Sequence, residues 1–189
     1  MKEIFEITII GRGGQGSKTT SEVIASTALR AGKYIQAFSE YGAERTGAPM
    51  TSYVRISDKP ITIHCTIIDP DLTVIMDDGL LEMASCSRAD QMLIVNTPKE
   101  PKEIKNILGL KLGRVFAVDS TKISIETLGM NVPNTPTLGA IAKAAGEKIV
   151  DKQQLETELR AKLEKKIGKD AMDKNIVCLN RGYDEVKEG

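Results

Sequence analysis

The feature that most constrains this chain is a glycine-rich hexapeptide near its start, Gly11-Arg-Gly-Gly-Gln-Gly16. The apolar run 4–10 comes directly before it, and the helix-like stretch 17–31 follows directly after it. A strand, a glycine turn and a helix in that order bring backbone N–H groups and a helix N-terminus to face an anion such as a phosphate. The sequence therefore predicts an anionic ligand at residues 11–16.

The glycines have separate expected roles in this loop. Gly11 permits the tight turn, Gly13 and Gly14 let a ligand approach the backbone, and Gly16 allows the helix to pack closely on the strand. The alternative is a tight strand–helix turn that binds nothing, because such turns also select glycine.

Three side chains of the same segment offer further contacts. Arg12 and Lys18 flank the loop and are candidate partners for phosphate oxygens, and the Gln15 side-chain amide is a candidate ligand contact. A dinucleotide site would also require an acidic residue about 20 positions on, at the end of the second strand. Glu40 follows the predicted strand 34–38 and is the candidate for that role.

A second unusual segment, residues 40–49, reads Glu-Tyr-Gly-Ala-Glu-Arg-Thr-Gly-Ala-Pro. Its glycine and proline residues exclude regular structure, and Glu44, Arg45 and Thr46 lie between two of the glycines. Loops at the carboxyl ends of strands commonly hold ligands in α/β proteins. The alternative is an ordinary connection with a local Glu–Arg ion pair, which contributes little if exposed.

The remaining pattern predicts an α/β fold. Short Ile-, Val- and Leu-rich runs predict strands at 5–10, 34–38, 51–56, 61–66, 72–76, 91–95 and 114–118. The runs 51–56 and 61–66, joined by a Pro-containing turn, predict an antiparallel hairpin. Helices are expected at 17–31, 79–85, 101–108, 120–128 and 137–148. We expect a three-layer α/β/α domain with a mixed, mostly parallel sheet containing this hairpin, plus C-terminal helices.

Residues 151–189 form a highly charged tail to what we expect to be a single domain, 1–189. Leu155, Leu159, Leu163 and Ile167 recur every four residues and make one apolar stripe on a predicted helix. A second helix is expected at about 170–186. The stripe predicts packing on this domain or on a partner, and the spacing alone leaves both open.

Composition excludes several classes of function. Lys+Arg 26 and Asp+Glu 26 give zero net charge, which argues against a nucleic-acid-binding surface. No apolar run reaches the ~20 residues of a membrane helix, and the N-terminus lacks a signal-peptide layout, so we expect a cytoplasmic protein. The three cysteines are widely spaced and predict neither a disulfide framework nor a metal or cluster site. No residue stands out as catalytic.

Four segments together resemble one family. Residues 11–16, 38–50, 133–140 and 180–186 resemble the gamma subunit of 2-oxoacid:ferredoxin oxidoreductases, pyruvate synthase in particular. The resemblance spans essentially the whole chain.

This resemblance implies a non-autonomous subunit of an enzyme that oxidatively decarboxylates a 2-oxoacid, pyruvate by preference, to an acyl-CoA. It implies alpha, beta and delta-type partner subunits, or fusions of them, which carry thiamine diphosphate and iron–sulfur clusters and pass electrons to ferredoxin. This chain would help to form the coenzyme A site, through Arg12, Gly13, Gly14, Gln15, Gly16, Lys18 and Asn134. Glu44, Arg45 and Thr46 would lie at the subunit interface or close the active centre.

Other interpretations compete with this one. Thr135 and Pro136 beside Asn134 are typical of an N-cap followed by proline at the first helical position. Asp77 and Asp78 are typical of a helix-capping pair rather than a metal site. At the level of function, the alternatives are a free-standing NAD-binding dehydrogenase, or a structural interaction subunit whose glycine loop is empty.

Overall fold

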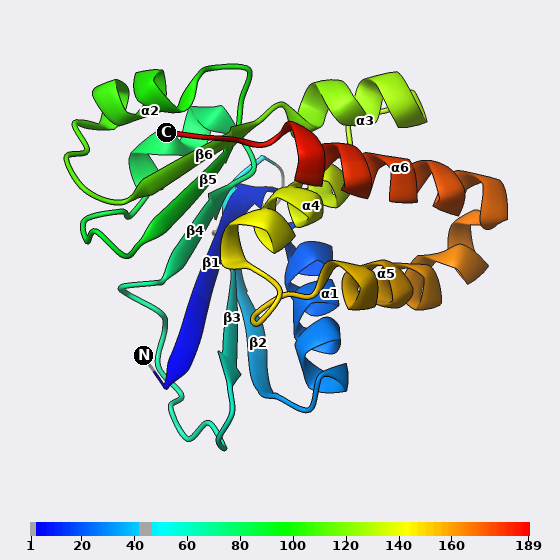
Figure 1. Ribbon diagram of the computed structural model, residues 1–189, viewed down its shortest axis with the longest axis horizontal. Coiled ribbons are helices and arrows are strands. Elements are labelled where there is room, and N and C mark those ends of the chain that lie inside the picture. The colour runs from blue at the N-terminus through cyan, green and yellow to red at the C-terminus, as the bar shows by residue number, and fades with distance from the viewer. Residues whose placement is uncertain (1–2, 42–46) are drawn as a thin grey trace.

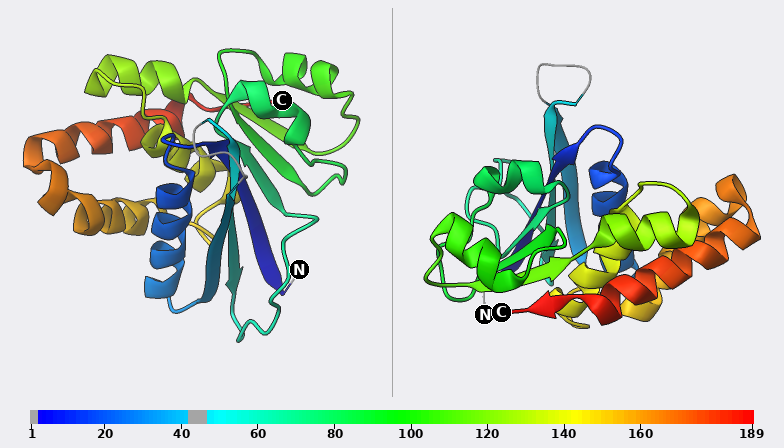
Figure 2. Two further views of the ribbon diagram at one scale, coloured as in Figure 1. Left: turned by 180° about the vertical axis from the view of Figure 1, so that it is seen from behind. Right: turned by 90° about the horizontal axis from the view of Figure 1, so that it is seen from above.

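The structure, a computed structural model, describes residues 3–41 and 47–189. Glu44, Arg45 and Thr46 lie outside the described residues. One sheet is sandwiched between two layers of helices (Figures 1 and 2). Its strands are β1 (Ile4–Arg12), β2 (Tyr34–Tyr41), β3 (Pro49–Ser57), β4 (Leu72–Ile75), β5 (Met92–Asn96), β6 (Arg114–Val118) and β7 (Lys187–Glu188).

The strands lie in the order β2-β3-β1-β4-β5-β6-β7. Strands β1, β4, β5 and β6 form a parallel core, whereas β3 and β7 run in the opposite direction to their neighbours. The expected three-layer fold with a mixed, mostly parallel sheet is confirmed. The expected hairpin between 51–56 and 61–66 is wrong, because β3 pairs with β1 along one edge and with β2 along the other. No edge of β3 is left for residues 61–66, which form no strand.

The helices divide between the two faces of the sheet. They are α1 (Ser17–Arg30), the 3-10 helix η1 (Asp78–Met83), α2 (Pro101–Leu108), α3 (Ser120–Leu128), α4 (Asn134–Ala145), α5 (Lys152–Ile167) and α6 (Lys169–Glu185). The view from above in Figure 2 shows α2 and η1 on one face and the other helices on the opposite face. Neighbouring strand residues such as Ile9 and Ile10 enter different apolar clusters, one on each face.

Local chemistry explains where several helices begin. The Asp151 carboxylate accepts a hydrogen bond from the backbone N–H of Gln154, 2.7 Å away, and Asp119 caps α3 in the same manner. Asp77 caps η1, so the predicted capping role of this residue is confirmed. The N-cap predicted at Thr135 is wrong, because α4 already begins at Asn134. The Thr135 hydroxyl instead donates to Asn175 Oδ1 on α6, 3.0 Å away.

The C-terminal helices belong to the core of this chain. Leu155 and Leu159 are fully buried, and α5 packs on α1. Helix α6 crosses α4 so closely that a Cβ added at Gly139 would lie 2.0 Å from the Leu179 carbonyl oxygen. A Cβ at Gly182 would lie 1.9 Å from the Pro136 carbonyl oxygen. Glycine at both positions therefore lets the two backbones touch.

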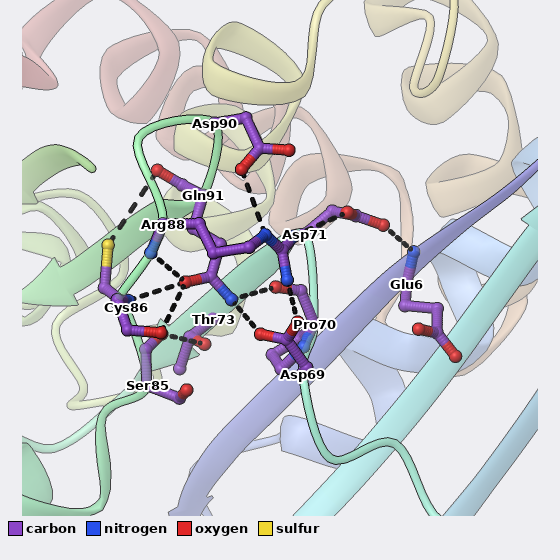
Figure 3. A network of polar contacts seen from close by, with 11 residues as sticks. Glu6, Asp69, Pro70, Asp71, Thr73, Ser85, Cys86, Arg88, Asp90 and Gln91 are labelled. Carbon is purple, nitrogen blue, oxygen red and sulfur yellow. Dashed lines mark hydrogen bonds and ion pairs between the residues drawn. The ribbon is translucent and has the colours of Figure 1, made fainter. Parts of the chain in front are cut away.

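A network of polar contacts anchors the amino ends of β4 and β5 (Figure 3). Arg88 pairs with three aspartates, Asp69, Asp71 and Asp90. The Gln91 side-chain amide donates to the Pro70 carbonyl oxygen at 2.9 Å and accepts from the Arg88 backbone N–H at 2.8 Å. This end of the sheet satisfies its own polar groups, and the glycine loop lies at the other end.

Candidate functional site at the glycine loop

The glycine loop lies at the carboxyl end of β1, beside the point where the connections change faces of the sheet. Strand β1 leads to α1 on one face, and its parallel neighbour β4 leads to η1 on the other (Figure 2). Ligands of open α/β sheets bind at such switch points. The loop therefore lies where open α/β sheets commonly bind their ligands.

The loop glycines differ in what surrounds them. A Cβ on Gly11 would lie 2.4 Å from Ser17 Oγ, and one on Gly16 would lie 2.9 Å from Asn134 Cβ. Gly14 and Gly16 also have φ values of +94° and +84°, which side chains rarely adopt. Around Gly13 and Gly14 a Cβ would meet nothing within 4 Å. The chain itself therefore fills the space at Gly11 and Gly16 and leaves it open at Gly13 and Gly14.

Arg12 and Gln15 hold the shape of the loop. Arg12 Nε lies 3.0 Å from Asp77 Oδ2, and its guanidinium also donates to the Gly47 carbonyl oxygen at 2.8 Å. Gln15 donates to the same Asp77 oxygen at 3.1 Å and accepts from the Arg12 backbone N–H at 2.7 Å. Both side chains predicted to contact a ligand thus have partners within the chain.

Two clefts of similar size border the loop. The polar cleft, about 680 Å³, lies at the ends of β4, β5 and β6, and its wall includes Gln15, Asp77, Asp78, Asn96, Asp119, Lys122, Glu126 and Asn131. The apolar cleft, about 700 Å³, lies between the loop and the C-terminal helices. It is lined by Gly14, Gly16, Thr19, Leu128, Met130, Val132, Asn134, Leu163, Ile167, Asp170, Ala171, Lys174 and Asn175.

The two clefts differ in charge. Four carboxylates line the polar cleft against one lysine, whereas the apolar cleft has one carboxylate, Asp170, and one lysine, Lys174. A hydrogen bond from Lys99 holds the pKa of the Asp78 carboxyl below its ordinary value, which keeps Asp78 ionised at the rim of the polar cleft. The polar cleft is therefore the less favourable of the two for an anion.

The two remaining predicted site residues that the structure describes, Asn134 and Lys18, lie in different places. Asn134 lines the apolar cleft beside Gly16, so these two residues, 118 positions apart, are brought together. Lys18 is exposed and lies away from both clefts, in a hollow with Phe38 and Tyr41 between α1 and β2. The structure therefore separates Lys18 from the side of the loop that carries Asn134.

The candidate ribose ligand of a dinucleotide site is also displaced. Because β3 is inserted between β1 and β2, Glu40 lies two strands away from the loop. Its carboxylate accepts hydrogen bonds from the Tyr53 hydroxyl and the Thr66 hydroxyl, both at 3.0 Å. Burial and this carboxylate raise the pKa of Tyr53 to about 12, so the tyrosine remains a donor. The expected match of Glu40 to a dinucleotide fingerprint is wrong.

Most of the apolar cleft was missed from the sequence. Much of its wall comes from the α3–α4 connection, the end of α5 and the start of α6. The lining residues missed are Thr19, Leu128, Met130, Val132, Asp170, Ala171, Lys174 and Asn175. The apolar stripe predicted on α5 did contain part of the cleft wall. Its first two leucines are buried, but Leu163 and Ile167 face the cleft, and Ile167 is 41% exposed.

Among residues 3–41 and 47–189, no group of three or more His, Cys, Asp or Glu side chains is arranged to hold a metal ion. Within the same part of the chain, no helix combines the length and the apolar character needed to cross a membrane.

Comparison with known proteins places this geometry in a family. The model of the pyruvate ferredoxin/flavodoxin oxidoreductase family matches residues 6–185. The pyruvate synthase subunit PorC of Thermotoga maritima is 41% identical over 188 residues, 98% of this chain and 96% of that protein. A common gamma subunit of pyruvate/ketoisovalerate oxidoreductases from Pyrococcus abyssi is 40% identical over 97% of this chain and 98% of that protein.

Solved structures agree with the sequence comparison. The crystal structure of the Thermotoga maritima PORC subunit matches with a TM-score of 0.83 and 38% identity, over 100% of this chain and 99% of that one. The 2-oxoglutarate:ferredoxin oxidoreductase of Magnetococcus marinus shares the fold, with a TM-score of 0.79 and 20% identity over 96% of this chain and 31% of its own. The chain therefore belongs to the pyruvate ferredoxin/flavodoxin oxidoreductase family and is similar over nearly its whole length to the gamma-type subunits of that family.

Proposed function

We propose that this chain is the gamma subunit of a 2-oxoacid:ferredoxin oxidoreductase and contributes part of its coenzyme A site. The reaction converts a 2-oxoacid and coenzyme A into an acyl-CoA and CO2, and the electron pair released passes to ferredoxin. Pyruvate is the preferred substrate, since the relatives at 41% and 40% identity are both named for pyruvate enzymes. The second is common to pyruvate and ketoisovalerate enzymes, which supports a substrate choice made on other subunits.

The open backbone at Gly13 and Gly14 is the observation that carries the coenzyme A role. Coenzyme A is a phosphate-rich anion, and the loop presents the N-terminus of α1 with unfilled space in front of it. The apolar cleft beside it carries no excess of carboxylates, so we place the coenzyme on that side. Gly13, Gly14, Gly16 and Asn134 are the proposed contacts.

The other predicted contacts take indirect roles in this proposal. Arg12 and Gln15 hold the loop through Asp77, and Lys18 lies outside the site. Glu44, Arg45 and Thr46 remain proposed as interface or closing residues on the strength of the resemblance. Thiamine diphosphate and iron–sulfur clusters are assigned to alpha, beta and delta-type partners, and the protein is proposed to act in the cytoplasm.

Anaerobic affinity purification of the tagged chain from its own cells tests this function. We expect brown, thiamine-containing partner chains to co-elute, with reduction of a viologen dye that requires both a 2-oxoacid and coenzyme A. Pyruvate, 2-oxoisovalerate and 2-oxoglutarate would be compared, and NAD would serve as the control acceptor. A colourless chain that elutes alone and without this activity would contradict the proposal.

The same preparation separates the proposal from a purely structural subunit. The Gly14→Ala complex should still assemble, because Gly14 faces open space, but its KM for coenzyme A should rise. An assembled variant complex with an unchanged KM for coenzyme A would favour the empty-loop alternative.

A further inference from the structure

Among the described residues that line the apolar cleft, one buried side-chain atom, on Asn134, has no hydrogen-bond partner. Asn134 is 93% buried at the start of α4, and its Oδ1 atom is shielded from solvent without a hydrogen-bond partner in the described part of the chain. A buried acceptor left unpaired costs free energy, so proteins rarely keep one without a reason. Asn134 is therefore a candidate for a contact with something outside this chain.

Asn175, the other asparagine in the cleft wall, has its side-chain amide paired within the chain. Asn175 Oδ1 accepts from the Thr135 hydroxyl at 3.0 Å, and Asn175 Nδ2 donates to the Ala171 carbonyl oxygen at 2.8 Å. The contact of Asn134 with Gly16 fixes where its amide lies, but no hydrogen bond to a described residue fixes how the amide is turned. A half-turn about the last side-chain bond exchanges the oxygen and nitrogen, and this torsion is soft.

The walls around Asn134 are aliphatic. Leu128, Met130, Val132, Leu163 and Ile167 line the cleft, and only Asp170 and Lys174 bring charge to it. Such a surface suits an uncharged, flexible chain with methyl groups and few polar atoms. It does not suit a nucleotide diphosphate, whose charges need donors and water.

We propose that the apolar cleft holds the pantetheine arm of coenzyme A, and that the Asn134 side-chain amide hydrogen-bonds with an amide of that arm. This inference rests on the proposed coenzyme A function and assigns the two halves of the coenzyme to different parts of the site. The phosphates lie at the N–H groups of residues 13–16, and the dimethyl and methylene groups of the arm lie against the aliphatic walls. A secondary amide both donates and accepts, so it can pair with Asn134 in either orientation.

Asn134→Leu in the assembled enzyme tests the inference, because leucine keeps the branched shape and the number of heavy atoms of the side chain and removes the amide. We expect the KM for coenzyme A to rise about tenfold, with the KM for pyruvate unchanged. The inhibition constant of 3′,5′-ADP, which carries the 3′-phosphate and the first 5′-phosphate of coenzyme A but neither its second 5′-phosphate nor pantetheine, should not change. Because the native amide makes no hydrogen bond within the described chain, the melting temperature should not fall.

A wall substitution keeps the test independent of how Asn134→Leu folds. Ile167→Ser, at a partly exposed position in the cleft, should also raise the KM for coenzyme A and leave 3′,5′-ADP inhibition unchanged. Asn131→Leu is the matched control, since Asn131 lines the polar cleft and its variant should leave both constants at wild-type values.

The outcomes separate a failure of the pantetheine assignment from a failure of the proposed coenzyme A site. If Asn134→Leu raised the KM for coenzyme A and the inhibition constant of 3′,5′-ADP by the same factor, the pantetheine assignment would be overturned. The proposed coenzyme A site would stay in place. An unchanged KM for coenzyme A in both cleft variants would also overturn the pantetheine assignment. If the Gly14→Ala complex also has an unchanged KM for coenzyme A, the proposed function of the loop fails as well.

Discussion

Glycines occur in two regions of this molecule for opposite reasons. At the crossing of α4 and α6, Gly139 and Gly182 touch the backbone of the opposite helix, with no room for a Cβ. At the loop, Gly13 and Gly14 face open space in which a Cβ would contact nothing. The first pair serves the packing of the chain on itself, so the second pair is better explained by a molecule that approaches from outside.

The two ends of the sheet also differ in how their polar side chains are paired. At the amino ends of β4 and β5, Arg88 and Gln91 bind side chains and carbonyl groups of this chain. At the carboxyl ends, Asn134 is buried with an unpaired acceptor. The carboxyl ends also have paired side chains, such as Arg12 with Asp77, so the difference between the two ends lies in the buried acceptor of Asn134.

The largest effect should come from Gly182→Ala. The new Cβ would lie 1.9 Å from the Pro136 carbonyl oxygen, which is backbone and cannot rotate away. We expect the free energy of unfolding to fall by about 3 kcal/mol or more, because the two helices must separate. Urea unfolding of the full chain measures this, with the exposed Asp184→Ala on the same helix as control. Equal stability of the two variants would show that the crossing is looser than described.

Gly14→Ala should have an intermediate effect. Its φ of +94° is unfavourable for alanine, although no atom opposes the methyl group. The expected loss of stability is about 1–2 kcal/mol, from backbone strain alone. The same urea titration measures it, and a loss as large as that of Gly182→Ala would abolish the contrast between the two regions.

Arg12→Ala should lower the free energy of unfolding by less than Gly14→Ala does. The Arg12–Asp77 ion pair is 3.0 Å long, but its side chains are 40% and 24% exposed, so solvent screens it. We expect about 0.5–1 kcal/mol of lost stability and a modest rise in the KM for coenzyme A, because the loop loses a support rather than a ligand contact. Lys18→Ala is the comparison, with no expected change in that KM. If Lys18→Ala raised the KM for coenzyme A strongly and Arg12→Ala left it unchanged, Lys18 rather than Arg12 would belong to the site.

Gly13→Ala should leave stability nearly unchanged and yet affect binding. Gly13 has no positive φ, and its Cβ position is open, so the free energy of unfolding should change by no more than about 0.5 kcal/mol. The methyl group would occupy the space proposed for the coenzyme, and we expect about a tenfold rise in its KM. Unfolding and steady-state assays on the same preparation check both parts. A normal KM would mean that nothing binds closely at this position.

Much of the fold could be predicted from local patterns. Helices α1, α2 and α3 and the parallel core strands follow from apolar runs, caps and breakers that lie within a few residues of one another. The pairing of β3 could not be predicted, because residues 61–66 have the same strand-like composition as the true partner β2. Strand pairing depends on which edge is free, and that is decided by residues far away in the chain.

The place of the candidate site in the chain could be predicted, but not the residues that line its cleft. The glycine loop and Asn134, both named from the sequence, line the apolar cleft, whereas Lys18 lies in a separate hollow between α1 and β2. Met130, Val132 and Lys174 also line the cleft, and no sequence pattern pointed to them. A cleft exists only where separate elements meet, so its lining residues share no local pattern.

The sequence by itself determined the family, the strand–glycine loop–helix unit and most helix ends, because those depend on backbone preferences and hydrogen bonds over a few residues. The tertiary structure alone decided that β3 separates Glu40 from the loop and that Arg12 pairs with Asp77. It also decided that α5 and α6 fold back to close the apolar cleft over Asn134. The physical reason is that these features are contacts between distant segments, which form only when the sheet and the helix crossing bring the segments together.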